Sequence, residues 1–282
     1  MKKILVFFAV IIFIAAVLSL MLTFSHKLPI GEKVALIRIE GVILDSKNII
    51  EELKEHSEDA SVKAIVLRVD SPGGGVAPSQ EIYEELVKIK GKKKIVVSMG
   101  SVAASGGYYV SSPADKIVAN PGTLTGSIGV IMEIPNVEGL MNKIGLKTEV
   151  IKSGEHKDIG SMFKTMTDEE KEILQAVLDD VHDQFIKAIS DARGMEIAVI
   201  RKLADGRIFT GRRAKELGLV DELGNLEDAI QLAGKISGIK GKPEVVYKTN
   251  KFSFLDIIRG NLPDELIKEA FPAIRLKYLL TP

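Results

Sequence analysis

The chain has 282 residues, of which 46% are hydrophobic and 27% charged, which suffices for one large domain or two small ones with an ordinary core. Lysine plus arginine and aspartate plus glutamate each number 38, so the net charge gives no indication of a nucleic-acid partner. There are no cysteines, which excludes disulfides, thiol catalysis and cysteine-based metal sites. No zinc-ligand spacing is present either, and we expect neither a metal nor another cofactor.

The N-terminus has the pattern of a membrane anchor. Residues 4–24 carry no charge, and at about 1.5 Å per residue they can cross the roughly 30 Å hydrocarbon core of a bilayer. Lys2 and Lys3 precede them, so the positive-inside rule places the chain beyond Lys27 on the extracytoplasmic side. A cleaved signal peptide is the alternative, but it needs small residues at its end, which Leu20–Phe24 does not offer. We expect residues 1–27 to be an uncleaved single-pass anchor in the cell membrane.

Beyond the anchor, the apolar pattern predicts alternating strands and helices. The nearly continuous apolar run at residues 63–69 is typical of a strand buried on both faces. A long helix is expected to open at Thr167 and Glu170, which have capping-box spacing, and to end at Gly194. In chain order we predict strands at 34–39 and 63–69, a helix at 79–90, a strand at 94–98, a short helix from 105 to near 113, strands at 116–119 and 147–151, and the long helix at 167–194.

This alternation predicts an α/β domain with a largely parallel sheet over residues 28–240. The long helix should turn one apolar stripe towards the core, formed by Ile173, Leu174, Val177, Leu178, Val181 and Phe185. Residues 241–282 are less regular and are punctuated by prolines. We expect them to form a tail packed on the domain or on a neighbouring subunit.

Ser105 stands between a predicted strand and a predicted helix, in the run Gly100-Ser-Val-Ala-Ala-Ser-Gly-Gly107. Small neighbours would let a substrate backbone approach closely. Gly106 and Gly107 would fall in the first helical turn, where free N–H groups and the helix dipole favour developing negative charge. The pattern indicates a nucleophilic serine, and the alternative is a simple helix cap.

A second glycine-rich turn follows the buried strand, with the sequence Asp70-Ser-Pro-Gly-Gly-Gly75. Its backbone N–H groups could hold a phosphate or an oxyanion. The turn matches neither the dinucleotide fingerprint nor the P-loop, so nucleotide binding is disfavoured. A plain strand-to-helix turn is the alternative.

A serine nucleophile needs a base, and one segment of the chain offers two. His26 would abut the membrane, His56 falls in a charged predicted helix, and His182 lies on the polar side of the long predicted helix. The segment Ser153–Gly160 instead leaves a predicted strand, has a glycine at position 154 and another at its end, and carries both His156 and Lys157. From the residues alone, either side chain could be the base.

These segments, in this order, resemble the signal peptide peptidase A family, whose members are membrane-anchored serine peptidases related in fold to Clp protease and crotonase. The resemblance covers residues 34–240 and corresponds to the short form with one catalytic domain. It implies a Clp protease/crotonase-like fold of repeated strand-strand-helix units with one N-terminal transmembrane helix. Besides the two glycine-rich segments, it rests on Thr125–Gly129, Ser153–Gly160, Gly206–Gly211 and Ala214–Asp221.

The resemblance implies a Ser/Lys dyad with Ser105 as nucleophile and Lys157 as general base. Ser127 would hold the lysine amine. The backbone N–H of Gly106 would be one oxyanion donor, and Gly73 or Gly74 would give the other.

A lysine accepts a proton only as the neutral amine, which at neutral pH requires a pKa about three units below the ordinary value of about 10.4. We expect burial beside Val150 and Ile151 to favour the neutral amine of Lys157. A close carboxylate would favour its charged form, so we expect Asp158 to point away.

The implied activity is hydrolysis of extended apolar peptides, such as remnant signal peptides or misfolded exported chains, by a homo-oligomeric ring. A site tethered at the bilayer would meet such peptides at high effective concentration. Two other classes stay open: a crotonase-like acyl-thioester enzyme and a catalytically inactive membrane scaffold. The apolar C-terminal segment at residues 271–280 could be trimmed by the enzyme itself, or could simply pack on the subunit surface.

Overall fold

The computed structural model describes Phe13, residues 31–247 and residues 277–279. Apart from Phe13, the expected membrane span at residues 4–24 lies outside the described residues. So do residues 248–276 and 280–282, which make up most of the expected tail. Within the described part of the chain, none of the helices is long and apolar enough to cross a membrane.

The domain is built on an eight-stranded sheet with the order β7-β6-β4-β2-β1-β9. β5 pairs with the first part of β4, β6 pairs with its last part, and β8 extends the β5 branch. All of these pairs are parallel except β6 with β7, which confirms the predicted, largely parallel sheet. The strands are β1 (Lys33–Glu40), β2 (Val62–Ser71), β4 (Lys94–Ala104), β5 (Lys116–Ala119), β6 (Leu124–Gly126), β7 (Ile208–Thr210), β8 (Glu222–Leu223) and β9 (Glu244–Val246).

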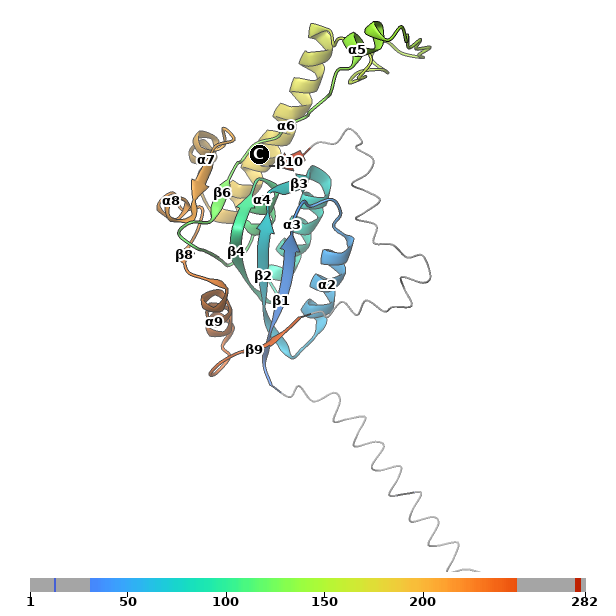
Figure 1. The fold of residues 1–282 in the computed structure, drawn as a ribbon. Helices are drawn as coiled ribbons and strands as arrows, with labels where there is room; N and C mark the ends of the chain where they lie inside the picture. Colours follow the sequence, from blue (N-terminus) through green and yellow to red (C-terminus); the bar gives the residue numbers. More distant parts are fainter. Residues whose placement is uncertain (1–12, 14–30, 248–276, 280–282) are drawn as a thin grey trace, which may run out of the picture.

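Helices cover both faces of this sheet (Figure 1). The C-terminal half of the long helix packs on one face together with several shorter helices, and the helix at Leu226–Ser237 packs on the other face. The helices are α2 (Lys47–Glu58), α3 (Val76–Lys90), α4 (Gly106–Ser111), α5 (Glu138–Lys143), α6 (Asp168–Arg193), α7 (Ile197–Leu203), α8 (Gly211–Glu216) and α9 (Leu226–Ser237).

The middle of β2 is a continuous apolar run because each face of the strand packs on its own cluster. In β2, Ile65 and Leu67 join a cluster with Leu86 of α3 and Phe185 of α6. The alternate residues, such as Val66, join a second cluster that includes residues of α9. Successive side chains of a strand point to opposite faces, so a strand covered on both faces reads as a continuous apolar run.

The long helix α6 begins and ends as predicted, but only half of it is buried. Thr167 Oγ1 accepts a hydrogen bond from the Glu170 N–H (3.2 Å), the Glu170 carboxylate accepts one from the Thr167 N–H (3.0 Å), and Gly194 adopts φ 63°. Val181 and Phe185 are buried, whereas Ile173 and Val177 are 37% and 40% exposed. The expectation of a fully inward stripe is therefore wrong, because the first half of α6 extends beyond the sheet (Figure 1).

Residues 131–167, called the arm below, run beside this projecting half of α6 and contain α5 (Figure 1). The predicted strand at 147–151 is wrong, since these residues form no strand. Val150 is 51% exposed and Ile151 fully exposed, so the apolar run that suggested a strand has no sheet to join. Instead, the Val137 N–H donates to the Met162 carbonyl (2.8 Å), which ties the two ends of the arm together.

A short two-stranded sheet lies at the carboxyl end of β2. Its strands are β3 (Gly73–Gly75) and β10 (Lys277–Leu279), which run antiparallel with Tyr278 opposite Gly74. The C-terminal segment of the chain thus contacts the glycine-rich turn through its backbone.

Candidate active site

Ser105 occupies a sharp turn between β4 and α4. Its backbone has φ 52° and ψ −117°, a region that costs a non-glycine residue about 1–3 kcal/mol. Two hydrogen bonds hold the turn: the Ser105 N–H donates to the Gly126 carbonyl, and the Tyr109 N–H donates to the Ser105 carbonyl, both at 2.8 Å. The strained backbone is thus fixed by β6 on one side and α4 on the other.

The Ser105 hydroxyl is buried and unpartnered. The residue has 0% exposure, and among the described residues its Oγ has no hydrogen-bond partner. A buried polar group without a partner costs about 1–3 kcal/mol, so such groups are rare and call for an explanation. Strain and an unsatisfied hydroxyl at the same residue indicate a site kept ready for another group.

A bulge at the end of β2 and β4 brings this turn to the sheet edge. Val69 pairs with Met99, but Ser71 pairs with Ala103, so β4 contains extra residues there. The Asp70 carboxylate accepts a hydrogen bond from the Val102 N–H (3.0 Å) and holds the bulge. A Cβ on Gly100 would lie 2.6 Å from the Asp70 side chain, which explains the glycine at that position.

The two glycines after Ser105 let α4 pack directly on the second glycine-rich turn. A Cβ on Gly106 would lie 2.8 Å from Ser79 Oγ and 3.2 Å from Gly73 Cα and Gly74 N. A Cβ on Gly107 would lie 2.7 Å from the Ser71 carbonyl oxygen. The two motifs that the sequence analysis singled out are therefore in contact.

Within this second turn, the N–H groups have different partners. The Gly75 N–H donates to the Ile43 carbonyl (2.8 Å), and the Gly73 N–H donates to Ser71 Oγ (3.1 Å). Gly74 forms a parallel bridge with Ile43, which directs its own N–H to the opposite side, towards β10. The Gly73 N–H is thus bonded within the turn, whereas the Gly74 N–H faces the position that β10 occupies.

Ser127 lies next to Ser105 across the sheet. It follows Gly126, which pairs with Ala104 in the β4–β6 ladder, and its N–H donates to the Arg207 carbonyl (2.8 Å). Ser127 is 7% exposed and has φ 50°. In the described chain, Ser105 and Ser127 are the only non-glycine residues with positive φ, so both backbone irregularities fall at the same edge.

Lys157 is not part of this group. It is exposed in the arm, where its N–H donates to the Gly154 carbonyl (3.2 Å), and the arm lies at the far end of α6 from β4 and α4 (Figure 1). The expectation that Val150 and Ile151 bury this lysine is wrong, since both are exposed. The neighbouring His156 instead approaches Glu169 (3.7 Å).

Asp158 points away from Lys157, as expected. Its carboxylate binds Lys152 Nζ at 2.7 Å and Lys164 Nζ at 3.1 Å. The hydrogen bonds from Lys152 and Lys164 lower the pKa of Asp158 to about 2. The charge beside Lys157 is therefore already neutralised within the arm.

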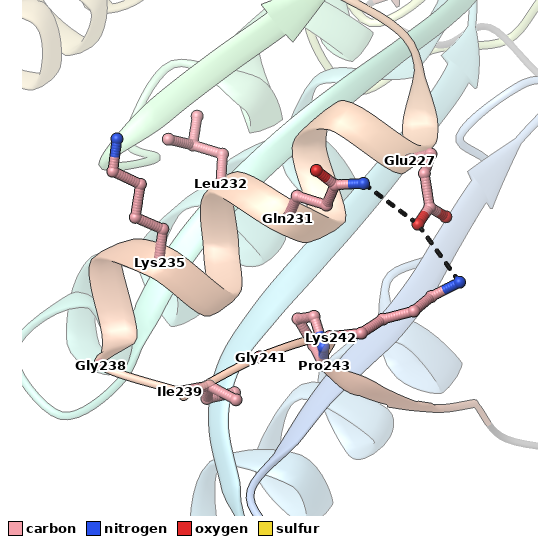
Figure 2. A pocket seen from close by; sticks show the side chains of 9 residues that line it. All are labelled: Glu227, Gln231, Leu232, Lys235, Gly238, Ile239, Gly241, Lys242 and Pro243. Carbon is pink, nitrogen blue, oxygen red and sulfur yellow. Dashed lines mark hydrogen bonds and ion pairs between the residues drawn. The ribbon is translucent and has the colours of Figure 1, made fainter.

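A surface groove lies at the opposite edge of the sheet, between α9 and the segment that leads into β9 (Figure 2). Its polar contacts join Glu227 to Lys242 (3.7 Å) and to Gln231 (3.4 Å). β9 is parallel to β1 and begins beside the groove, whereas Ser105 follows the carboxyl end of β4. The groove therefore belongs to the edge away from Ser105.

Sequence reasoning missed three residues that shape the site. Ser71 and Ser79 hold the glycine-rich turn through Gly73 and Gly75, and Ile43 pairs with Gly74 from a different part of the chain. Ser71 stood inside a motif that had been singled out, so its position was a usable signal. Nothing in the sequence marked Ile43, because its role comes from its backbone.

Comparisons with known proteins identify the family. The model described as Peptidase family S49 matches residues 88–240, and the one described as Clp protease matches residues 36–121. A protein of Synechocystis sp. that is named as a protease is 44% identical over 210 residues, 74% of this chain and 76% of its own length.

Further relatives carry more specific names. A signal peptide peptidase SppA of Enterococcus faecium is 36% identical, covering 82% of this chain and 71% of the relative. Protease 4 of Salmonella typhi is 38% identical over 82% of this chain, which spans 39% of that protein. A ClpP1 mutant of Listeria monocytogenes superimposes with a TM-score of 0.48 at 20% identity, covering 69% of this chain and 93% of that one. The chain belongs to peptidase family S49 and is a serine peptidase with a Clp protease-like α/β fold.

Proposed function

We propose that this chain is a membrane-anchored serine endopeptidase in which Ser105 attacks the peptide carbonyl and Lys157 of a neighbouring copy is the general base. The observation that carries the proposal is the strained and buried Ser105, whose hydroxyl has no partner among the described residues. The next residue, Gly106, packs against Gly73 and Gly74. This packing supports Ser105 as the nucleophile, with the N–H groups of Gly74 and Gly106 as the proposed oxyanion donors.

The reaction needs no group from outside the chain and its copies except water. The neutral amine of Lys157 takes the proton from Ser105 Oγ as Oγ bonds to the peptide carbonyl carbon. The carbonyl oxygen becomes an oxyanion, which the N–H groups of Gly74 and Gly106 stabilise. Collapse breaks the C–N bond, and the departing amine takes the proton from Lys157. Water then hydrolyses the acyl-enzyme by the same steps, and Ser127 holds the lysine amine throughout.

The neighbouring copy is proposed because the arm leaves the lysine and an apolar surface exposed together. Leu140, Ile144, Leu146 and Val150 are each more than half exposed, and Ile151 is fully exposed. Several exposed large apolar side chains on one segment are typical of an interaction site. An arm that packs on the next subunit would bury these side chains and bring Lys157 to that subunit's Ser105. Repetition of such a head-to-tail contact closes into a ring when the rotation permits.

The proposed substrate is an extended peptide that takes the place of β10 on β3. β10 already runs antiparallel to Gly73–Gly75, beside Gly106, so the backbone of β3 can accept a strand at this place. Strand addition gives affinity through main-chain hydrogen bonds and leaves sequence preference to side-chain pockets. It suits remnant signal peptides and unfolded exported chains, which are extended and apolar.

Because β10 lies on β3, we also predict that the enzyme can trim its own C-terminal segment. A C-terminal segment that lies on β3 is placed as a substrate would be. Intact mass spectrometry of the wild type and Ser105→Ala distinguishes the alternatives: trimming requires a shortened C-terminus in the first and full length in the second. Equal full-length masses would leave packing as its role.

Membrane anchoring rests on the uncharged residues 4–24 and the two preceding lysines. The described domain begins at Gly31, seven positions after Phe24. A span at residues 4–24 would therefore hold the domain close to the bilayer. External protease should digest the domain in intact spheroplasts if it lies on the extracytoplasmic side. Digestion only after lysis would reverse the orientation.

A fluorophosphonate probe tests the chemistry directly. We expect it to label the wild type at Ser105 and to leave Ser105→Ala unlabelled. An acyl-thioester enzyme of the crotonase type or an inactive scaffold needs no activated serine, so absence of labelling in the assembled wild type would favour those classes.

A further inference from the structure

The carboxylate of Asp158 lies between two lysines, directly after the proposed base in sequence. Lys152 Nζ is 2.7 Å and Lys164 Nζ 3.1 Å from Asp158 Oδ1. Lys152 also donates to the Glu155 carbonyl (2.6 Å), which closes the turn that contains Lys157. The Asp158 side chain is 13% exposed, whereas Lys157 is exposed. The Asp158 carboxylate is thus held by lysines within the arm, while Lys157 is open to solvent.

The two lysines connect this turn to the start of α6. Lys164 Nζ also donates to the Glu170 carboxylate, whose other oxygen accepts the Thr167 N–H and closes the capping box. Glu170 is 4% exposed. A continuous path of charged contacts therefore runs from the turn of Lys157 through Asp158 and Lys164 to the first turn of the longest helix.

Two other ion pairs lie at the same end of α6. His156 approaches Glu169 (3.7 Å), and Lys171 pairs with Asp168 (2.7 Å). Glu155 contributes its backbone carbonyl to Lys152. Among the described residues of the turn and of α6, the Asp158 carboxylate is the one that two ammonium groups share.

We propose that Asp158 is a positioning residue: by binding Lys152 and Lys164, its carboxylate fixes the turn that presents Lys157 and is itself kept neutralised and turned away from that amine. The inference rests on the proposed role of Lys157 as general base. A carboxylate within about 4–6 Å of an ammonium favours the charged form, which cannot accept a proton. The two lysines therefore preserve the base as well as the shape of the turn.

Loss of Lys152 should accordingly change the pH dependence of catalysis as well as its rate. In Lys152→Met, the turn loses its closure and Asp158 loses its nearer partner, so its carboxylate is free to approach Lys157. We expect the rising limb of kcat/KM to move about 1 pH unit to the alkaline side, with about tenfold lower activity at neutral pH. In Lys152→Met combined with Asp158→Asn, the limb should return to the wild-type pH while kcat stays low.

The measurement is kcat/KM against pH with a fluorogenic peptide, with melting temperature and assembly mass followed in parallel. Lys152→Arg should restore the wild-type profile, and Lys171→Met, which removes an exposed pair at the same end of α6, should leave it unchanged. If Lys152→Met fails to assemble, Lys164→Met is the second variant. We expect it to move the rising limb of kcat/KM in the same direction.

Two results in correctly assembled variants would overturn the positioning role. In the first, the rising limb of kcat/KM stays at the wild-type pH when Lys152 or Lys164 is replaced. In the second, the limb stays displaced when Asp158→Asn is added to Lys152→Met. A simple structural role predicts the first of these, with lower kcat alone. Failure of the proposed function has a different signature, because Lys157→Ala would then keep wild-type activity.

Discussion

The edge of the sheet around Ser105 and the arm that carries Lys157 are built in opposite ways. At the edge, Ser105, Gly106 and Ser127 are buried, and their positions are fixed by backbone contacts within one chain. In the arm, apolar side chains such as Ile151 are exposed, and charged pairs rather than a core hold the turn of Lys157. Within one chain, the proposed nucleophile is held in place and the proposed base stands apart from it. The contrast supports the proposal that a second copy completes the site.

The largest expected effect separates the two candidate bases in the arm. Lys157→Ala should lower kcat by at least about 10³-fold, because residues that act as a unit lose most of their effect together. His156→Ala is the matched control and should keep activity, since His156 pairs with Glu169 on α6. Steady-state kinetics on the two assembled variants checks this, and the reverse ranking would assign the base to His156.

At the edge, close packing makes Gly106 sensitive to a single methyl group. In Gly106→Ala the new Cβ would lie 2.8 Å from Ser79 Oγ, so the turn must shift and displace the N–H that faces the oxyanion. We expect a loss of about 100-fold in kcat and about 1–3 kcal/mol in the free energy of unfolding.

Gly139→Ala is the control for this substitution. Gly139 lies in α5 of the arm, where an added Cβ meets nothing within 4 Å. Kinetics and chemical denaturation should show a lower kcat and a lower free energy of unfolding for Gly106→Ala, and no change in either for Gly139→Ala. Equal tolerance at both glycines would contradict the close packing of α4 on β3.

The apolar surface of the arm should matter for assembly. Ile151→Glu places a charge on a fully exposed apolar position and should shift the protein towards smaller species, with activity falling in proportion. Val87→Glu changes a 44% exposed apolar residue on α3 and should leave the assembly mass unchanged. Light scattering coupled to size exclusion measures both, and an unchanged mass for Ile151→Glu would place the interface elsewhere.

The smallest expected effect is on the charged cluster of the arm at acid pH. The folded-state pKa of Asp158 is about 2 against an ordinary 3.8, so its contribution is present above about pH 4 and is lost as pH falls towards 2. Hydrogen exchange, corrected for its intrinsic pH dependence, should show residues 150–166 opening in that range before β4 does. Simultaneous opening of both regions would argue against a separately held arm.

Much of the edge could be predicted from the sequence, because its signals are local. The buried strand before Gly73, the small residues around Ser105 and the capping box at Thr167 each depend on near neighbours. Ser105, Ser127, Gly74 and Gly106 were singled out and lie together in the structure. The choice between Gly73 and Gly74 needed Ile43, which no local pattern connects to them.

The arm could not be predicted in the same way, because its exposed apolar residues follow the same sequence patterns as buried ones. Val150 and Ile151 suggested a strand, and Ile173 and Val177 an inward stripe, yet all four are exposed. Periodicity reports that a face is apolar but not whether the covering element belongs to the same chain. The errors therefore gather where we propose that a second copy packs.

The most direct test of this account is complementation between two inactive variants. Ser105→Ala keeps an intact Lys157, and Lys157→Ala keeps an intact Ser105. When equal amounts are dissociated, mixed and reassembled, random neighbours should give about a quarter of the wild-type activity, and a fluorophosphonate probe should label only the chain that retains Ser105. Mixed assemblies without activity, beside active wild type treated identically, would contradict a site shared between two copies.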